Sequence, residues 1–302
     1  MLLEQLLVLY IFIFLGWLFG KVKPETAQGS KLLSFLLVNL LLPSKVFLNF
    51  SQSFTVSYFK ENYLTVIISV SILTALALLS IPLSGLLSKK DYEKRVYRYS
   101  FVLTNYAYMG YTLIENAMGK SALANMMTFC IPFAIYTYTF GYVMLTGNGR
   151  FAKKLINPMI GATVLGCAFG LCGAQLPSIL NTALSSASAC VGPLSMLLIG
   201  LVLASFPNKE LLPDKGTLAF VGLRLLVLPA MVLGVCKLLS LVVTLPPAVY
   251  PFAVLVACMP CGLNTVVFPK LVGEDCRRGA RMVLYSHLFS IASISLWISI
   301  LM

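Results

Sequence analysis

The segment from Asn105 to Thr112 reads NYAYMGYT, and a second segment, from Met259 to Thr265, reads MPCGLNT. Each interrupts a long apolar stretch with residues that weaken a helix, Gly110 in the first and Pro260 with Gly262 in the second. A break in an apolar environment leaves backbone N–H and C=O groups without partners, which is costly. Such breaks are tolerated only where those groups are bonded again or line a cavity. The two segments therefore mark a candidate ligand site.

The composition around these segments excludes most soluble folds. Of the 302 residues, 59% are hydrophobic and 11% are charged, against about 45–50% and about 25% in an average soluble domain. A helix that crosses a hydrocarbon core of roughly 30 Å needs about 20 residues. We therefore predict an all-α polytopic membrane protein with ten transmembrane helices. The predicted spans are 2–20, 31–50, 63–87, 97–117, 124–146, 157–175, 182–205, 217–242, 248–269 and 280–301.

The two halves of the chain resemble each other. Gly16-Trp-Leu-Phe-Gly20 is matched by Gly166-Cys-Ala-Phe-Gly170, and Pro43 is matched by Pro193, in both cases 150 residues further on. Each half holds five spans, so the second half enters the membrane in the opposite sense. Inverted repeats of this kind are typical of transporters, and chance similarity between apolar helices is the alternative. The predicted domains are a first repeat (1–146), a cytoplasmic linker (147–156) and a second, inverted repeat (157–302).

The positive charge indicates an orientation rather than a nucleic-acid surface. The net charge is +12, but the basic residues form short clusters between apolar spans, and we expect no nucleic-acid partner. Seventeen of the 22 Lys and Arg residues fall on one side of the predicted topology, and only Lys60 and Lys120 fall on the other. The positive-inside rule puts the first side in the cytoplasm. The prediction is thus a protein of the cytoplasmic (inner) membrane with both termini outside.

The fourth and ninth spans contain the candidate site. We predict that they break near Gly110–Thr112 and Gly262–Thr265, and that the broken helices cross. The N-terminal ends of the half-helices carry partial positive charge and would favour an anion, whereas close packing of small residues is the alternative. The candidate substrate-binding residues are Lys45, Asn105, Gly110, Tyr111, Thr112, Cys261, Gly262, Asn264 and Thr265.

Several other polar residues lie inside or beside predicted spans. Lys45 could attract an anion or pair with an acid, and Glu115 could bind a proton or cation, or pair with Lys45. His287, the single histidine, could relay protons or pack between helices. Arg224 is expected near the cytoplasmic face. Neither a metal site nor a cofactor is predicted, and the candidate hinges are Pro43, Pro193 and Pro260.

Two sets of residues resemble the auxin efflux carrier family, which includes bacterial members and the plant PIN-type carriers. They are Asn105, Met109 and Gly110 in span 4, and Pro260, Gly262, Phe268 and Lys270 in span 9. Thr112 and Thr265 stand where the family has crossover prolines. Because a threonine hydroxyl can bond a freed backbone carbonyl, we expect the breaks to persist.

The resemblance implies a scaffold of spans 1, 2, 6 and 7, and a transport domain of spans 3–5 and 8–10. It also implies transport of an organic anion, such as auxin or a dicarboxylate, by elevator-type alternating access. A sodium-coupled symporter of the bile-acid type and a non-transporting sensor or scaffold are the alternatives. An enzyme is not expected, since the spans lack a nucleophile with its base. The expected partners are a small carboxylate and the lipid bilayer, with a homodimer left open.

Overall fold

The computed structural model describes residues 2–147, 157–242, 244–246 and 249–301. Among these residues it contains helices and no strand, which confirms the prediction of an all-α protein. The predicted linker, 147–156, lies outside the described residues except for Gly147. All eight cysteines are free thiols.

Seven helices of the described chain are long and apolar enough to cross a membrane. Two shorter apolar helices, α9 (Pro158–Cys172) and α14 (Val249–Cys258), accompany them. The predicted fourth and fifth spans follow each other without a loop, and the chain turns between them at Gly119, whose φ of 85° suits a residue without a side chain. The seven are Leu3–Val22, Pro24–Ser53, Val56–Leu87, Tyr106–Thr146, Ser178–Ala204, Lys215–Ser240 and Arg277–Leu301.

The chain divides into two compact units. Unit 1 comprises residues 1–63, 107–134 and 155–205, and unit 2 comprises residues 64–106, 135–154 and 206–302. The expected scaffold spans 1, 2, 6 and 7 fall in unit 1, and spans 8, 9 and 10 fall together in unit 2. Spans 4 and 5 differ from the expectation, because each is divided between the units.

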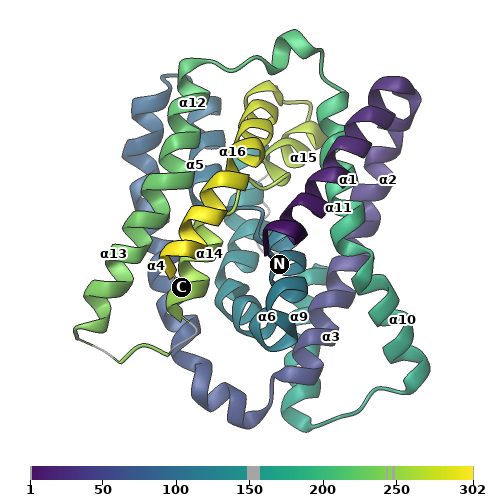
Figure 1. Ribbon diagram of the computed structural model, residues 1–302, viewed down its shortest axis with the longest axis vertical. Coiled ribbons are helices and arrows are strands. Elements are labelled where there is room, and N and C mark those ends of the chain that lie inside the picture. The colour runs from purple at the N-terminus through teal and green to yellow at the C-terminus, as the bar shows by residue number, and fades with distance from the viewer. Residues whose placement is uncertain (1, 148–156, 243, 247–248, 302) are drawn as a thin grey trace. The chain divides into compact units, whose positions relative to one another are not determined.

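Glycine contacts hold unit 1 together. Helix α1 (Leu2–Val22) packs along α11 (Val191–Ala204), and α9 packs along α3 (Leu42–Ser53), as Figure 1 shows. A Cβ atom added to Gly200 would lie 2.1 Å from the carbonyl oxygen of Ile13, and one added to Gly16 would lie 2.2 Å from that of Leu197. On α9, a Cβ atom added to Gly166 would lie 2.9 Å from the carbonyl oxygen of Phe47. The repeated glycines thus mark close helix–helix approaches.

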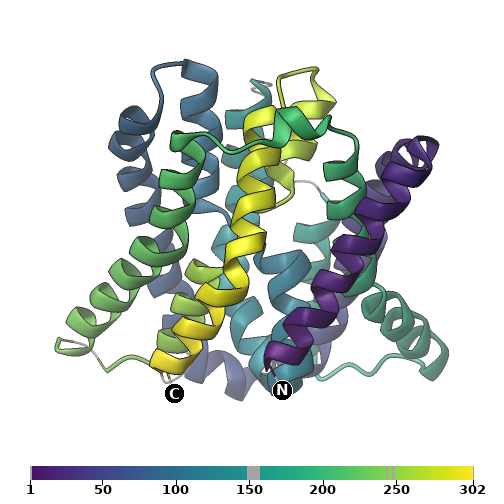
Figure 2. The ribbon, with the colours of Figure 1, turned by 45° about the horizontal axis from the view of Figure 1, so that its top comes forward.

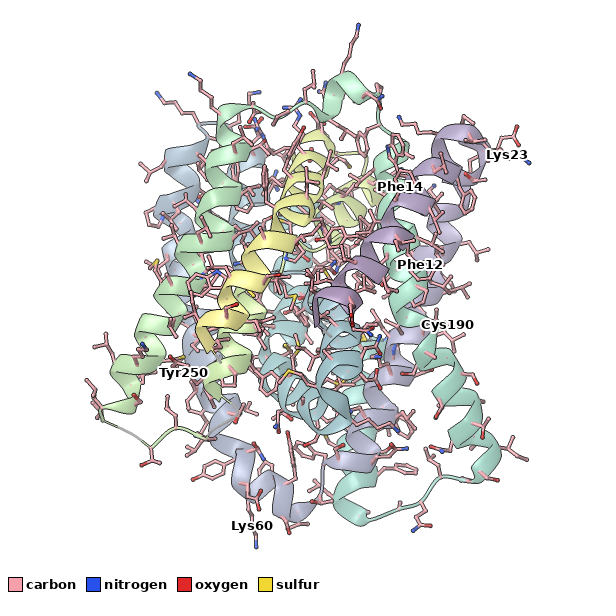
Figure 3. All side chains as sticks on the ribbon, viewed as in Figure 1. Phe12, Phe14, Lys23, Lys60, Cys190 and Tyr250 are labelled. Carbon is pink, nitrogen blue, oxygen red and sulfur yellow. The ribbon has the colours of Figure 1, made fainter. Side chains whose placement is uncertain are left out.

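The basic residues Lys23 and Lys60 mark the two ends of unit 1. Lys23 follows α1, and Lys60 lies in the first turns of α4 (Val56–Leu87). Figure 3 labels both side chains and shows them at opposite ends of this unit. Between these ends unit 1 also contains α2 (Ser30–Leu36) and α10 (Ser178–Ala189).

Unit 2 contains the helices of predicted spans 8, 9 and 10. Helix α12 (Lys215–Gly222) continues through η6 (Leu223–Val227), a π-helical turn, into α13 (Leu228–Ser240). Helix α12 packs beside α16 (Arg277–Leu301), as Figure 2 shows. The wider π turn is held by Trp297, whose indole N–H donates to the carbonyl oxygen of Leu225 at 2.8 Å.

An aromatic cluster joins further elements of unit 2. Phe268 of α15 (Asn264–Leu271) contacts the rings of Tyr99, Tyr138 and Tyr142. Tyr99 belongs to α5 (Asp91–Val102), and Tyr142 opens α7 (Tyr142–Thr146). Tyr138 lies in η4 (Thr137–Gly141), which follows the long helix α6 (Tyr111–Tyr136). Rings from three segments therefore fix the position of the short helix α15.

Candidate functional site

Two broken helices cross within unit 2. Helix α5 ends at Val102 and α14 ends at Cys258, and the residues that follow each helix are not helical. Thr104 and Cys261 form an antiparallel bridge, and the backbone N–H of Asn105 donates to the carbonyl oxygen of Pro260 at 2.8 Å. The breaks of spans 4 and 9 therefore lie together, and their two backbone segments bond to each other.

Gly262 allows the two backbone segments to come close at this crossing. A Cβ atom added to Gly262 would lie 3.1 Å from the carbonyl oxygen of Thr104. The same close approach occurs where α16 covers α15, since a Cβ atom on Gly279 would lie 2.5 Å from the carbonyl oxygen of Thr265. Small residues at both places therefore let backbone face backbone.

The position of the break in span 4 differs from the prediction. The break comprises Leu103–Asn105, whereas Gly110 lies in the π-helical turn η3 (Tyr106–Gly110), and Tyr111 and Thr112 open α6. The pairing with residues 260–261 ends the helix at Val102, and the π turn accommodates Gly110. The break in span 9 lies close to its predicted place, between Cys258 and Asn264, and includes Pro260 and Gly262.

Hydroxyl side chains satisfy groups that the second break frees. The hydroxyl of Thr265 donates to the carbonyl oxygen of Gly262 at 2.7 Å, as expected for a threonine beside a helix break. The backbone N–H of Cys261 donates to the hydroxyl oxygen of Ser286 at 2.9 Å. Thr112 behaves differently, because its Oγ1 is buried and has no hydrogen-bond partner in the described chain.

Asn105 and His287 form a hydrogen-bonded pair inside unit 2. The Nδ1 atom of His287 lies 2.7 Å from the carbonyl oxygen of Val283, which can only accept, so Nδ1 carries a proton. The Nε2 atom lies 3.0 Å from the amide nitrogen of Asn105. Because that nitrogen can only donate, Nε2 is the acceptor and the imidazole is neutral.

Unpartnered polar atoms gather at the crossing. Thr104 Oγ1, Asn105 Oδ1 and Asn264 Oδ1 are buried without a hydrogen-bond partner among the described residues. Buried polar atoms in proteins are normally bonded, so each calls for an explanation. A bound ligand that donates hydrogen bonds would supply one.

The other predicted binding residues lie in unit 1. Lys45 forms an ion pair with Glu115, one of the two arrangements expected for them. Gly110, Tyr111 and Thr112 belong to the same unit, and Thr112 contacts α11, where a Cβ atom on Gly192 would lie 2.4 Å from its methyl group. Within unit 2 the structure instead brings together Asn105, Cys261, Gly262, Asn264, Thr265 and His287.

The three predicted hinge prolines differ in their surroundings. Pro260 lies in the break of span 9. Pro193 lies in the first turn of α11, just after the bend at Cys190 that separates α10 from α11. Pro43 lies in a continuous helix, where the π-helical turn η2 (Leu37–Leu41) precedes it. A π turn widens the helix before Pro43, so the proline needs no interruption of the chain.

Arg224 is the residue of unit 2 whose complete burial the sequence analysis did not predict. It is expected near the cytoplasmic face, and the structure buries it completely in η6. Its three guanidinium nitrogens have no hydrogen-bond partner within the described chain. A basic residue about one third of the way along a span was the available signal, because intramembrane charges are functional candidates by default.

A polar ion cluster lies at the predicted cytoplasmic end of unit 2. The Asp214 carboxylate caps α12 by accepting from the backbone N–H of Thr217 at 2.7 Å, and Arg278 and Arg281 also donate to it. Burial alone would raise the pKa of Asp214, but the bonds from Thr217 and Arg278 outweigh it and the net pKa is lowered. Arg278 also pairs with Glu93. The cluster therefore links α5, α12 and α16.

We expect Asp214→Asn to reduce the pH dependence of stability while keeping the helix cap, because asparagine also caps helices. A carboxyl whose pKa is lowered on folding stabilises the protein above its unfolded pKa of about 3.9, and this is lost as the pH falls further. The stability gap between wild type and Asp214→Asn should therefore narrow below about pH 4. Chemical denaturation across pH 3–7 measures the gap. A stability gap independent of pH would contradict the prediction. Asp214→Ala also loses the helix cap, so its free energy of unfolding should be about 1 kcal/mol lower than that of Asp214→Asn at every pH.

The ion pair of unit 1 is expected to be asymmetric. Lys45 is 3% exposed and Glu115 is 27% exposed. Glu115→Met should therefore destabilise more, by about 3–5 kcal/mol, because it leaves a buried ammonium without a partner. Lys45→Met should cost less, since water reaches the remaining carboxylate. The double variant should regain most of the stability, and equal losses in all three proteins would exclude a buried pair. Thermal unfolding in lipid nanodiscs measures the three values.

Comparison with known families places this architecture in a class. The sequence profile of a family described as membrane transport protein matches residues 1–154 and, a second time, residues 147–298. The chain therefore belongs to the membrane transport protein family, which is the auxin efflux carrier family that the residue pattern resembles. This is a family of transporters and not of enzymes. A comparison with curated proteins finds no match to the chain.

Proposed function

We propose that this membrane transport protein is a secondary transporter that binds a small organic anion, a carboxylate, at the crossing of its fourth and ninth spans. The observation that carries the proposal is the crossing itself, where two helices break inside unit 2 and face each other through their backbones. Paired breaks at matching positions of two halves are typical of transporter binding sites. Helix α15 begins at Asn264, beside the crossing, and directs the positive end of its dipole there.

The proposal includes ten membrane spans in two inverted repeats. Two observations support it. The family profile matches each half of the chain separately. Span 1 packs against span 7, and span 6 packs against span 2, with glycines 150 residues apart at both contacts. We further propose that both termini lie outside the cytoplasmic membrane and that access alternates by an elevator-type movement.

The membrane potential sets the direction of uncoupled transport. An inside-negative potential is worth about 2.3 kcal/mol per charge per 100 mV. It would drive a monoanion outward without a coupling ion. Proton-coupled import is the second candidate, and the bond between Asn105 and His287 favours it.

The coupling would work through the orientation of the Asn105 amide. With neutral His287, the amide nitrogen donates to the ring and the amide oxygen stays unpartnered. A protonated ring would donate from Nε2, so the amide would turn and direct its N–H groups away from the histidine. A protonated His287 would therefore favour anion binding. Glu115, which pairs with Lys45, is the second residue proposed for coupling.

The test is transport by the purified protein in liposomes. Radiolabelled indole-3-acetate, malate and lactate would be loaded, and efflux measured under an imposed inside-negative potential. Efflux of at least one acid, absent from liposomes without protein, is the expected result. Binding without movement would indicate a sensor, and transport that requires a sodium gradient would indicate a bile-acid-type symporter. An inward flux that requires an inward proton gradient would select the second candidate.

A further inference from the structure

Arg224 combines a full charge with complete burial. It lies nine residues after the start of α12, within a helix predicted to cross the membrane. Its side chain has no exposed surface, and Nε, Nη1 and Nη2 have no partner among the described residues. An arginine cannot neutralise itself by losing its proton. A charge in this position is costly unless something compensates it.

The carboxylates of the sequence are not placed to compensate Arg224. In unit 2, Glu93 and Asp214 pair with Arg278, and Asp275 pairs with Arg277. None of the ten acidic residues lies within the predicted spans 8, 9 or 10. The full set is Glu4, Glu25, Glu61, Asp91, Glu93, Glu115, Glu210, Asp214, Glu274 and Asp275. The compensating charge must therefore come from outside the span helices of this unit.

The surroundings of Arg224 connect it to the crossing. The turn η6 packs against α14 and α16. The thiols of Cys258 and Cys261 lie close enough to the guanidinium to interact with it electrostatically. Cys258 is the last residue of α14, and Cys261 forms the bridge with Thr104. Arg224 therefore lies beside the break of span 9, and both belong to unit 2.

We propose that Arg224 binds the acid group of the transported anion, and that this anion also carries a hydrogen-bond donor. The inference rests on the proposed function, which it makes more specific. A guanidinium can hold a carboxylate through two parallel N–H···O bonds. The remaining unpartnered atoms of the crossing, Thr104 Oγ1, Asn105 Oδ1 and Asn264 Oδ1, include two amide oxygens, which can only accept. A hydroxyl or N–H group on the ligand would satisfy them.

Three small probes separate these two requirements. Lactate has the carboxylate and a hydroxyl donor, propionate has only the carboxylate, and lactamide has the hydroxyl without the charge. Each is added at millimolar concentration and constant ionic strength to the full-length protein in nanodiscs, and the midpoint of thermal unfolding is followed. The variant is Arg224→Met. The matched control is Arg277→Met, which removes an arginine of the same unit that is exposed and paired with Asp275.

The proposal expects lactate to stabilise wild type and Arg277→Met alike. The apparent Kd for lactate should rise at least about tenfold in Arg224→Met, and propionate should bind wild type several-fold more weakly than lactate. Lactamide should have no effect. Without any probe, Arg224→Met should unfold at a higher temperature than wild type, because methionine removes an uncompensated charge.

Three results would overturn the proposal. The first is that lactate does not stabilise wild type, and the second is that lactate stabilises Arg224→Met as much as wild type. The third is that Arg224→Met without any probe unfolds at a lower temperature than wild type, which would indicate a structural role. Liposome efflux distinguishes this failure from that of the proposed function. If lactate binds through Arg224 but no acid is transported, the arginine site is supported and the proposed transport function is refuted. If acids are transported equally well by wild type and Arg224→Met, the transport function is supported and the arginine site is refuted.

Discussion

Asn105→Ala protein in liposomes is expected to bind and transport its carboxylate with a binding free energy weaker by about 1–3 kcal/mol, the cost of leaving a buried hydrogen-bonding group of the ligand without a partner. The side chain lies in the crossing, 1% exposed, and its amide holds the neutral ring of His287. Alanine removes the amide from the site and also leaves Nε2 of His287 without this partner. Substrate affinity and flux would be measured side by side with wild type.

The control for this change is Asn208→Ala. Asn208 belongs to the same unit, lies in the short 3-10 helix η5 (Asn208–Leu211), and is exposed. It should transport as wild type does. Asn105→Ala protein that folds normally and shows unchanged affinity and flux would reduce Asn105 to a packing residue that bonds two helices.

Gly200→Ala is expected to destabilise the protein strongly, by about 3 kcal/mol or more, because overpacking against a backbone leaves little room to relax. The new methyl group would lie 2.1 Å from the carbonyl oxygen of Ile13 and 2.5 Å from the backbone nitrogen of Trp17. Helices α1 and α11 would have to separate along their contact. Thermal unfolding and recovery of monodisperse protein after extraction measure the effect.

Gly161→Ala is the matched control. Gly161 lies in α9 of the same unit, and a Cβ atom there would meet nothing within 4 Å. Alanine is the better helix former by about 0.5–1 kcal/mol, so this variant should be as stable as wild type or more so. Stability changes of opposite sign for Gly200→Ala and Gly161→Ala would show that the change depends on the helix contact and not on the loss of a glycine. Equal midpoints would contradict the close approach of α1 and α11.

The sequence predicted the type of fold and part of the site, and the reasons are local. Apolar length and charge counts predict membrane helices, because each span must satisfy its own backbone bonds. The break at Pro260 could be predicted because proline removes a donor from its own helix. The hydrogen bond of Thr265 to Gly262 follows from the same local logic.

What the sequence missed depends on contacts between distant segments. The break of span 4 falls at Leu103–Asn105 because that segment pairs with residues more than 150 positions away, and no local residue marks it. The burial of Arg224 depends on which way a π turn rotates its side chain, which a count along the span does not show. The bond between Asn105 and His287 likewise joins residues of different helices.

The pairing of α1 with α11 also implies a delay during synthesis of the protein. Gly16 meets Leu197, so the partner of the first helix is made 181 residues later. At 5–20 residues per second, this is a delay of roughly 10–40 s. Throughout that time the glycine face of α1 is uncovered in the bilayer, open to lipid and to other newly inserted helices. The contact between α1 and α11 therefore forms only after about two thirds of the chain has been made, and the insertion machinery must hold the unfinished protein until then.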